Sequence, residues 1–472
     1  MIPIRTSSLV FIAAMAAAGA MAGGGRAADG QTGAPDIEGN SLVVTDDAAS
    51  APPADIEALL RAIPELAPSN TEKAGQCLSF NATLARVVEN DPRIAEAASA
   101  LDVQEAELSM ARANRLPQIE SFSRAGLGDG LQAENLIDNR VGVRVSQRIF
   151  GFGAGRFERR AAAARAEAAG HDINAARLAV AVEAAEAYMS ALRAKARRAA
   201  AARIESYYAR DAAMAERRLA KGLLTIAEAN SIRAEFALAE ANSAREDLRI
   251  AQESARLSSL LGAPFACGVE PSVSAFLEAR RPPTFDEAAL EAVARSPSLN
   301  AARATIREAQ AESRRAGRAG LPQLSIGGTL AYDYDDARDA FERNDRFGLD
   351  ISAPIFQGGR NRFAKRRAQA RARGAEARLA REEQALREHL SVSWARVYHL
   401  HSVLIKQGAA RDSFAELSAA AEREFELGAL TAPELVNAKR DYYNAVLSEI
   451  DVRFELYAQE LSLIADTGRL LD

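Results

Sequence analysis

An internal repeat constrains this chain of 472 residues more than any other feature of its sequence. The tripeptide Leu-Pro-Gln occurs at Leu116 and again at Leu321, a spacing of 205 residues, and the same spacing aligns 85–100 with 290–305. After one inserted residue the spacing is 206, which aligns 141–160 with 347–366, 219–228 with 425–434, and Gly262 with Gly468. Agreement over this length with a single insertion indicates a tandem duplication.

Each half predicts the same series of elements. A helix that opens at a proline ends before Leu-Pro-Gln, because proline interrupts a helix and favours extended backbone in the residue before it. Alternating apolar and polar residues then predict two strands of about ten residues in each half. The expected strands are 118–127 and 140–150 in the first half, and 323–334 and 346–356 in the second.

Long helical hairpins follow the strands. Residues 154–220 hold 27 alanines and no proline, and a helix of that length would measure about 100 Å. Glycines at 222 and 428 interrupt the pattern before a second helix, so the hairpins are expected at 154–262 and 358–468. The second hairpin carries apolar residues at heptad spacing, namely Tyr443, Leu447, Ile450, Phe454, Tyr457, Leu461 and Ile464. Their counterparts in the first half are small and favour close helix packing: Ala237, Ala241, Ala244, Leu248, Ala251, Ala255 and Ser258.

The N-terminus predicts export. Residues 1–22 have the charge, the apolar run and the small residues of a signal peptide, and 23–76 have the composition of a flexible segment. The two repeats are expected at 77–263 and 284–472, joined by a linker at 264–283. Cys77 and Cys267, the only cysteines, are predicted to form a disulfide in an oxidising compartment, with two separate buried thiols as the alternative.

Composition excludes several functions. The net charge is −5, with acidic and basic residues interspersed, which argues against a nucleic-acid partner. His399 and His401 lie two apart on a predicted helix and so face different directions, which argues against a shared metal. The sequence therefore predicts neither an enzyme nor a cofactor. Basic residues open each long helix, where they indicate either contact with lipid head groups or a solvated helix face: Arg156, Arg159, Arg160, Arg362, Lys365, Arg366 and Arg367.

Four amphipathic strands cannot close into a barrel by themselves. Inside a bilayer every backbone group must be paired, and about eight strands is the minimum for a filled barrel. Three chains with four strands each would supply twelve strands. The alternative is a soluble sheet packed on the helices, which would leave the long hairpins without a purpose.

These features together resemble the TolC family of outer-membrane efflux and secretion channels. The resemblance rests on the signal peptide, the tandem halves, the Asn-Asp-Pro helix, the Leu-Pro-Gln strand entry, the 67-residue helix and the Gly-x-x-Thr turn. It implies a mainly α-helical homotrimer with a twelve-stranded transmembrane β-barrel in the outer membrane, surrounded by lipid. It further implies a coiled-coil tunnel through the periplasm, a periplasmic adaptor and an inner-membrane pump. The expected function is the exit duct of a tripartite efflux or type I secretion system.

The resemblance also assigns residues at the periplasmic end. The adaptor-docking tips would be Gly222, Leu223, Thr225, Gly428, Ala429 and Thr431, and the pore gate would be Glu228, Glu434, Asn437, Phe425 and Leu430. Asn437 stands where the family archetype has a second acid, and Phe425 and Leu430 stand where it has a tyrosine and an arginine. We therefore expect apolar closure, together with a ring of carboxylates that prefers cations and whose crowding raises their pKa.

Two other classes also contain long helices. A periplasmic adaptor has a single hairpin inserted in compact β-domains, whereas this sequence predicts two hairpins and two strand pairs. A coiled-coil scaffold would have no use for the amphipathic strands. Both are kept as alternatives to the channel.

Overall fold

The computed structural model describes residues 79–125, 140–263, 273–335 and 340–471. The predicted signal peptide, the segment 23–76 and both cysteines lie outside these ranges, so the disulfide stays a prediction. Within the described ranges, no helix combines the length and the apolar character needed to cross a membrane.

The two halves contain matching helices. The first has α2 (Phe80–Asn90), α3 (Pro92–Ala113), α4 (Ala154–Ala220) and α5 (Ile226–Leu261). The second has α7 (Phe285–Arg295), α8 (Pro297–Ala316), α9 (Arg360–Glu426) and α10 (Ala432–Asp466), and α6 (Val273–Arg280) lies between the halves. Helices α3 and α8 both begin at a proline, which suits the first helical position because the N–H that it lacks has no partner there. Helices α4 and α9 have 67 residues each, as the duplication requires.

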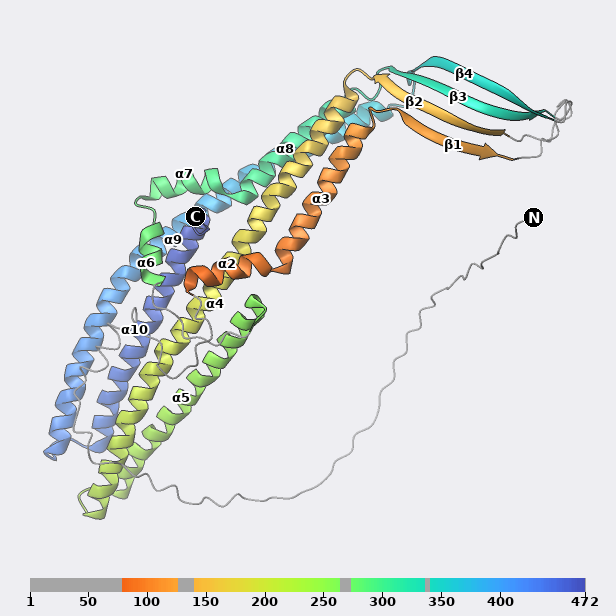
Figure 1. Cartoon of the computed structure of the whole chain (residues 1–472). Helices are drawn as coiled ribbons and strands as arrows, with labels where there is room; N and C mark the ends of the chain where they lie inside the picture. The colour runs from red at the N-terminus through yellow and green to blue at the C-terminus, as the bar shows by residue number, and fades with distance from the viewer. Residues whose placement is uncertain (1–78, 126–139, 264–272, 336–339, 472) are drawn as a thin grey trace, which may run out of the picture. The chain divides into compact units, whose positions relative to one another are not determined.

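One antiparallel sheet joins the halves. Its strands are β1 (Gln118–Arg124), β2 (Arg140–Phe150), β3 (Gln323–Asp335) and β4 (Ala340–Ser352), in the order β1-β2-β3-β4. The central pair, β2 and β3, comes from different halves and aligns Val143 with Leu330. Strands β1 and β4 each pair on one side only, so the sheet has two open edges (Figure 1).

Two strands differ from their predicted bounds. The last strand was expected at 346–356, but β4 begins at Ala340, where the polar segment 340–345 continues the pairing with β3. It ends at Ser352, shortly before Pro354, which has no N–H to donate to a ladder. The first strand was expected to reach 127, whereas β1 ends at Arg124 and residues 126 and 127 lie outside the described ranges.

The sheet has one apolar and one polar face. Val141, Val143 and Val145 alternate along β2 with Arg140, Arg144 and Ser146, and Tyr332 and Leu330 of β3 lie opposite Val141 and Val143. On β4 the apolar face continues at Phe347, Leu349 and Ile351, whereas Arg343 and Asp345 interrupt it opposite Tyr332 and Leu330. The apolar side chains that are exposed in this single chain include Ile119, Val141, Val143, Ile326, Leu330, Tyr332, Phe341, Phe347, Leu349 and Ile351. On the polar face Asp333 accepts hydrogen bonds from Arg140 and from Asn344.

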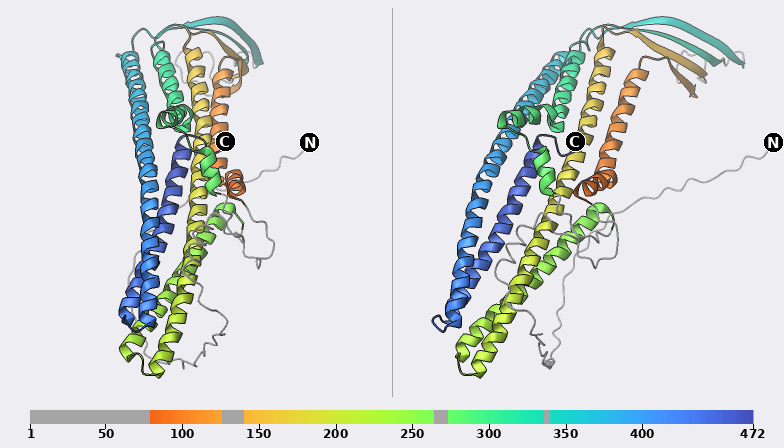
Figure 2. Two further views of the ribbon diagram at one scale, coloured as in Figure 1. Left: turned by 90° about the vertical axis from the view of Figure 1, so that its left-hand side faces the viewer. Right: turned by 60° about the vertical axis from the view of Figure 1, so that its left-hand side comes forward.

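The helices form a layer with a definite order. Helix α4 contacts α3 and α5 on one side and α8 and α10 on the other, whereas α9 contacts α8 and α10. Figures 1 and 2 show α4 with α5, and α9 with α10, as two long hairpins. Helices α3 and α5 therefore lie at one edge of the layer and α9 at the other.

Equivalent aromatic pairs pack in each half. Phe80 of α2 meets Tyr188 of α4 edge to face with ring centroids 5.2 Å apart, and Phe285 of α7 meets Trp394 of α9 at 5.9 Å. Such pairs add about 0.5–1.5 kcal/mol beyond the burial of their area. The repeat thus extends from the sequence to individual side-chain contacts.

The heptad seam differs between the halves. In α10 the predicted seam is largely buried, and Tyr443, Ile450 and Leu461 pack in the main core cluster with residues of α4. In α5 the counterparts from Ala237 to Ala255 are exposed, so the expectation of close helix packing at these positions is wrong within one chain. Helix α5 instead turns its Ile232 and Leu257 inward.

Candidate functional site at the hairpin tips

Each hairpin reverses direction at a glycine in the left-handed region. Gly222 has φ +68° and Gly428 has φ +74°, a conformation that costs glycine little because it has no Cβ. The backbone N–H of Leu223 donates to the carbonyl oxygen of Arg218, and that of Ala429 donates to Glu424, both at 2.9 Å. These bonds satisfy carbonyl groups that the helix ends would leave unpaired, so each tip is a rigid turn.

Capping boxes begin the second helix at both tips. The Glu228 carboxylate accepts hydrogen bonds from the backbone N–H of Thr225 at 2.9 Å and from its hydroxyl at 2.8 Å. The Glu434 carboxylate accepts the same two bonds from Thr431, at 2.9 and 2.6 Å. Both predicted gate acids therefore stabilise the start of a helix.

These hydrogen bonds change the acidity of both carboxyl groups. The backbone and side-chain bonds from Thr225 hold the pKa of Glu228 below its usual value, and those from Thr431 do the same for Glu434. This direction is opposite to the raised pKa expected from a crowded ring, because contact hydrogen bonds favour the charged form. Both acids are therefore anionic at neutral pH.

Phe425 and Leu430 belong to one apolar cluster that joins the two hairpins of a single chain. Phe425 is only 2% exposed and packs with residues of all four hairpin helices, among them Ala215 and Ile232 of the first half. The Arg218 guanidinium lies over its ring at 4.8 Å and donates to its carbonyl oxygen at 3.1 Å. Phe425 thus links the hairpins from within.

The remaining tip residues are open to solvent. Six exposed residues surround the turns: Gly222, Leu223, Thr225, Gly428, Ala429 and Thr431. Asn437 is also exposed and accepts a hydrogen bond from Arg440 at 3.4 Å. Ile226 and Leu427 add large exposed apolar groups, the latter 84% exposed, although the sequence reasoning did not single them out. The tips therefore present apolar side chains beside the capped acids.

A buried ionic cluster lies deeper between the hairpins, and the sequence reasoning missed it. The Lys439 ammonium of α10 contacts Asp211 of α4 at 2.7 Å and Glu422 of α9 at 3.3 Å. Burial raises the pKa of Asp211, against the opposing effect of Lys439. The available signal was the position of Lys439 at helical spacing between Leu435 and Tyr442, where an apolar residue is expected.

Further ion pairs connect the two hairpins. Arg197 of α4 bridges Asp451 of α10 at 2.6 Å and Glu246 of α5 at 3.0 Å. Arg440 of α10 pairs with Glu235 of α5. Polar links therefore accompany the apolar packing between the halves, and a relative movement of the hairpins would have to break them.

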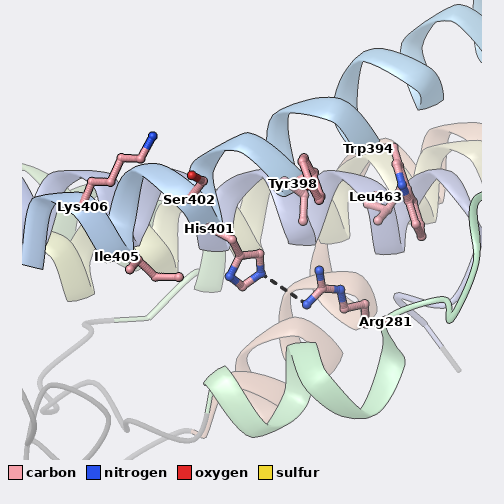
Figure 3. Close-up of a pocket in the computed structure, with 9 residues that line it drawn as sticks. Arg281, Trp394, Tyr398, His401, Ser402, Ile405, Lys406 and Leu463 are labelled. Carbon is pink, nitrogen blue, oxygen red and sulfur yellow. Dashed lines mark hydrogen bonds between the residues drawn. The ribbon is translucent and has the colours of Figure 1, made fainter.

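A hollow of about 370 Å³ lies beside α9, away from the tips (Figure 3). Trp394, Tyr398, His401 and Ile405 of α9 line it, and the Arg281 guanidinium points to His401 at 3.3 Å. The described residues contain no group of three or more potential metal ligands. The hollow is largely apolar, which suits packing against another surface.

A family model described as outer membrane efflux protein matches residues 83–263 and 289–469, which is more than half of the chain. The chain therefore belongs to the outer membrane efflux protein family. Each match covers one half, which confirms the internal repeat.

Solved structures share the fold. CusC is 18% identical, with 85% of this chain and 99% of that chain covered and a TM-score of 0.74. The outer membrane channel CmeC of Campylobacter jejuni is 15% identical, with 86% and 91% covered and a TM-score of 0.71. The MtrE outer membrane channel of Neisseria gonorrhoeae is 17% identical, with 86% and 96% covered and a TM-score of 0.71. A comparison with curated protein sequences gives no match.

The family and the fold confirm the predicted class of function. The chain is an outer-membrane efflux duct that extends into the periplasm, rather than an adaptor or a scaffold. The predicted TolC-like architecture, mostly helical with four antiparallel strands, is likewise confirmed.

Proposed function

We propose that three copies of this chain form the duct and that its hairpin tips meet a periplasmic adaptor of an inner-membrane pump, in efflux or type I secretion. The carrying observation is that one chain is open at two matching edges. In the sheet the edges are β1 and β4, and in the helical layer they are α3 with α5 and α9. Strand β1 follows α3 in the chain, and β4 precedes α9. A neighbouring copy that pairs with β1 would therefore also pack against α3 and α5, and a copy that pairs with β4 would also pack against α9.

The open strands require more than one copy, and the resemblance to the TolC family favours three. An exposed apolar sheet edge must be paired in a bilayer, and four strands per chain cannot pair their own edges. Three chains supply twelve strands, and head-to-tail contacts that close produce a ring. A closed twelve-stranded sheet would turn the apolar face of Val141, Val143 and Leu330 to lipid and the polar face of Arg140 and Arg144 to the duct.

The two helical edges are complementary in size. On α9, Tyr398 and Ile405 are 70% and 75% exposed and flank the hollow beside Trp394. On α5, the exposed counterparts of the α10 seam are mostly alanine, such as Ala244 at the position of Ile450. Since α10 packs against α4 within the chain, we infer from the repeat that α5 of the next copy packs against α9 in the same manner. Large side chains of α9 would then fill the space above small ones of α5.

The tips are the part of the chain suited to a partner and a gate. They combine exposed apolar residues, Leu223, Ile226 and Leu427, with two anionic carboxylates at Glu228 and Glu434. A partner helix with apolar side chains can cover the first set. Three chains would gather up to six carboxylates at the narrow end, which raises the local concentration of cations.

A substitution on α5 tests the assembly. Ala244→Trp adds bulk to an exposed position, so a lone chain tolerates it, whereas an α9 helix packed there is displaced. We expect loss of the trimer on native gels of outer-membrane extracts. Asn242→Trp, also exposed but on another side of α5, is the matched control and should leave the trimer intact. A normal trimer in the Ala244→Trp protein would refute this arrangement.

Crosslinking tests the partner. A photoreactive residue at Leu427 or Leu223 should capture a periplasmic adaptor in intact cells, since both side chains are exposed at the tips. The same residue at position 373, on the exposed surface of α9 far from its C-terminal end, is the control. Equal capture at both places would contradict docking at the tips.

A further inference from the structure

Four arginines surround a hollow where β2 turns into α4. The hollow has a volume of about 300 Å³ and lies between the end of α3, the end of β2 and the first turns of α4. Arg115 enters from the segment after α3, and Arg156 and Arg159 enter from α4. Arg148 enters from the end of β2, where a register shift between Arg148 and Phe150 interrupts the alternation that separates Arg140 and Arg144 from the apolar face. Glu158 is the one acidic residue that lines it.

Among the described residues, none of these four arginines is paired with a carboxylate. Glu158 accepts a hydrogen bond from the amide of Asn114 at 3.4 Å, and none of the four guanidinium groups forms an ion pair with any residue in the described ranges. Elsewhere in the molecule arginines are commonly paired, as Arg165 is with Glu308 and Glu312. Like charges held around one hollow repel each other, so the arrangement favours an anion.

The start of α4 reinforces this preference. Gly153 at its N-cap adopts φ +85° and provides no side-chain hydrogen bond to the first turn. The positive end of the helix dipole therefore faces the hollow without a capping carboxylate or hydroxyl. A planar guanidinium binds a phosphate or carboxylate through two parallel hydrogen bonds, which makes this group of arginines suited to a phosphate.

Apolar side chains border the same hollow. Ile149 and Phe150 line it and are 51% and 53% exposed, and Phe152 stacks edge to face on Phe150 with centroids 4.8 Å apart. Exposed aromatic rings next to basic groups are typical of the boundary between a bilayer and water. A soluble anion has no use for the rings, whereas a lipid offers an acyl chain to them and a head group to the arginines.

We propose that this hollow, which we call the junction site, binds the phosphate of an anionic phospholipid head group. The proposal rests on the proposed function, because a closed sheet in the outer membrane brings the end of β2 to the bilayer surface. The acyl chains would lie along Ile149 and Phe150, and the four guanidinium groups would surround the phosphate. The bound lipid would neutralise the arginines and fix the level of the duct in the membrane.

The second half provides an internal comparison. At its junction Gly320 and Pro354 replace Arg115 and Arg148, so that only Arg362 and Lys365, the counterparts of Arg156 and Arg159, remain. Ile355 and Phe356 are nevertheless exposed there, like Ile149 and Phe150. Apolar borders are thus common to both junctions, whereas the group of four arginines belongs to the first.

Lipid binding to the detergent-solubilised full chain tests the junction site. Phosphatidylglycerol should bind at least about tenfold more tightly than phosphatidylcholine, and Arg156→Gln/Arg159→Gln should remove that preference. Arg115→Gln/Arg148→Gln removes charge from the opposite wall and should have the same effect. Arg362→Gln/Lys365→Gln removes equal charge from the second junction and should change the affinity less than about threefold.

The possible results distinguish failure of the junction site from failure of the proposed function. Inorganic phosphate at the concentration of the lipid should not displace it; displacement would show a soluble-anion site and overturn the proposal. Equal binding of both lipids, or equal loss in the two half-specific variants, would overturn it as well. Trimer content and single-channel conductance are measured on the same preparations. A conducting trimer without lipid preference rejects the junction site alone, whereas absence of trimer and conductance rejects the proposed function.

Discussion

Tyr188 and Trp394 occupy equivalent positions in the two halves, but their surroundings differ. Tyr188 is fully buried, packs on Phe80 of α2, and belongs to a core cluster that also contains Phe276 of α6 and Ile450 of α10. Trp394 has the equivalent partner, Phe285, yet it lies beside an open hollow. Four residues further along, Leu192 is buried on α4 while its counterpart Tyr398 is exposed on α9.

The difference follows from position rather than from fold. Helix α4 has neighbours on both sides, whereas α9 has them on one side only. The side chains have diverged accordingly: α4 carries many buried alanines against the large residues of α10, whereas α9 carries large residues and α5 small ones at the two open edges. The duplicated unit thus forms one buried contact between the two hairpins, which we call the seam, and two complementary outer edges.

Charges show the same contrast between seam and surface. Lys439 is buried between Asp211 and Glu422, whereas its counterpart Arg233 makes an exposed pair with Glu216. Comparing a residue with its counterpart therefore separates the effect of burial between the hairpins on stability from the effect of the side-chain type. Each of the following predictions uses such a pair.

The largest effect is expected at the buried ion pair. Lys439→Met leaves the Asp211 carboxylate without its partner in a buried site, which costs about 3–5 kcal/mol of unfolding free energy. Arg233→Met breaks only a solvent-exposed pair and should cost less than about 1 kcal/mol. Chemical denaturation of the solubilised protein measures both values. Equal losses would show that the seam does not depend on this pair.

Phe425 should have the next largest effect. Phe425→Ala empties an enclosed site, at a cost of about 3–5 kcal/mol, and loosens the contact between the hairpins. Its counterpart Leu219 is only partly buried, so that Leu219→Ala should cost about half as much or less.

Conductance distinguishes packing from gating in the same variants. If the apolar cluster holds the duct closed, Phe425→Ala and Leu430→Ala raise single-channel conductance, whereas Leu219→Ala does not. Reduced stability with unchanged single-channel records would leave Phe425 as a packing residue and refute apolar closure.

Most of the fold could be predicted from the sequence because the two halves can be aligned with each other. A one-residue insertion in 180 aligned positions is visible without a structure, and proline, glycine and alternation delimit the helices and strands. The polar start of β4 was not predictable, since residues 340–345 join the sheet through backbone pairing with β3 and not through an apolar pattern. A sequence pattern shows the alternation of apolar and polar side chains, whereas strand pairing depends on hydrogen bonds of the backbone.

At the tips, sequence reasoning located the residues but not all of their interactions. Glu228 and Glu434 are predicted as acids of the gate, with a satisfied surface acid as the alternative for Glu228, but the capping boxes are not predicted. Each acid nevertheless follows a threonine by three residues, the spacing of a capping box. The cluster of Lys439, Asp211 and Glu422 involves three helices and both halves, so no local pattern contains it. Such contacts depend on the packing of elements distant in sequence.

The threonine caps should have a smaller effect than the seam. Thr225→Ala and Thr431→Ala each remove a hydroxyl that donates to the neighbouring glutamate, and loss of such a cap costs about 1 kcal/mol. Because the same two hydrogen bonds join threonine and glutamate at both turns, the two values should agree within about 0.5 kcal/mol. Hydrogen exchange of the first turn of α5 and of α10 measures the local loss. A difference well above this margin would show that the two tips are not equivalent.

Glu434→Gln should change stability least and selectivity most. Glutamine still accepts the hydrogen bond from the backbone of Thr431, so we expect little loss of stability. The substitution removes charge from the narrow end, so that the reversal potential in planar bilayers should shift toward weaker cation preference. Glu228→Gln tests the first-half counterpart, and Glu426→Gln, an exposed acid near the same turn, is the control.

The pH dependence of that selectivity decides between two opposing effects. Crowding in a ring would raise the pKa of Glu434, whereas its bonds to Thr431 lower that pKa below the ordinary 4.5. The hydrogen bonds act at 2.6 and 2.9 Å, whereas ring carboxylates interact through water and salt that screen charges beyond about 10 Å. We therefore expect cation preference to persist as pH falls to 4.5 and to weaken only below it. The cap contributes stability above the unfolded pKa and loses it in the same acidic range. Loss of preference already near pH 6 would show that crowding prevails.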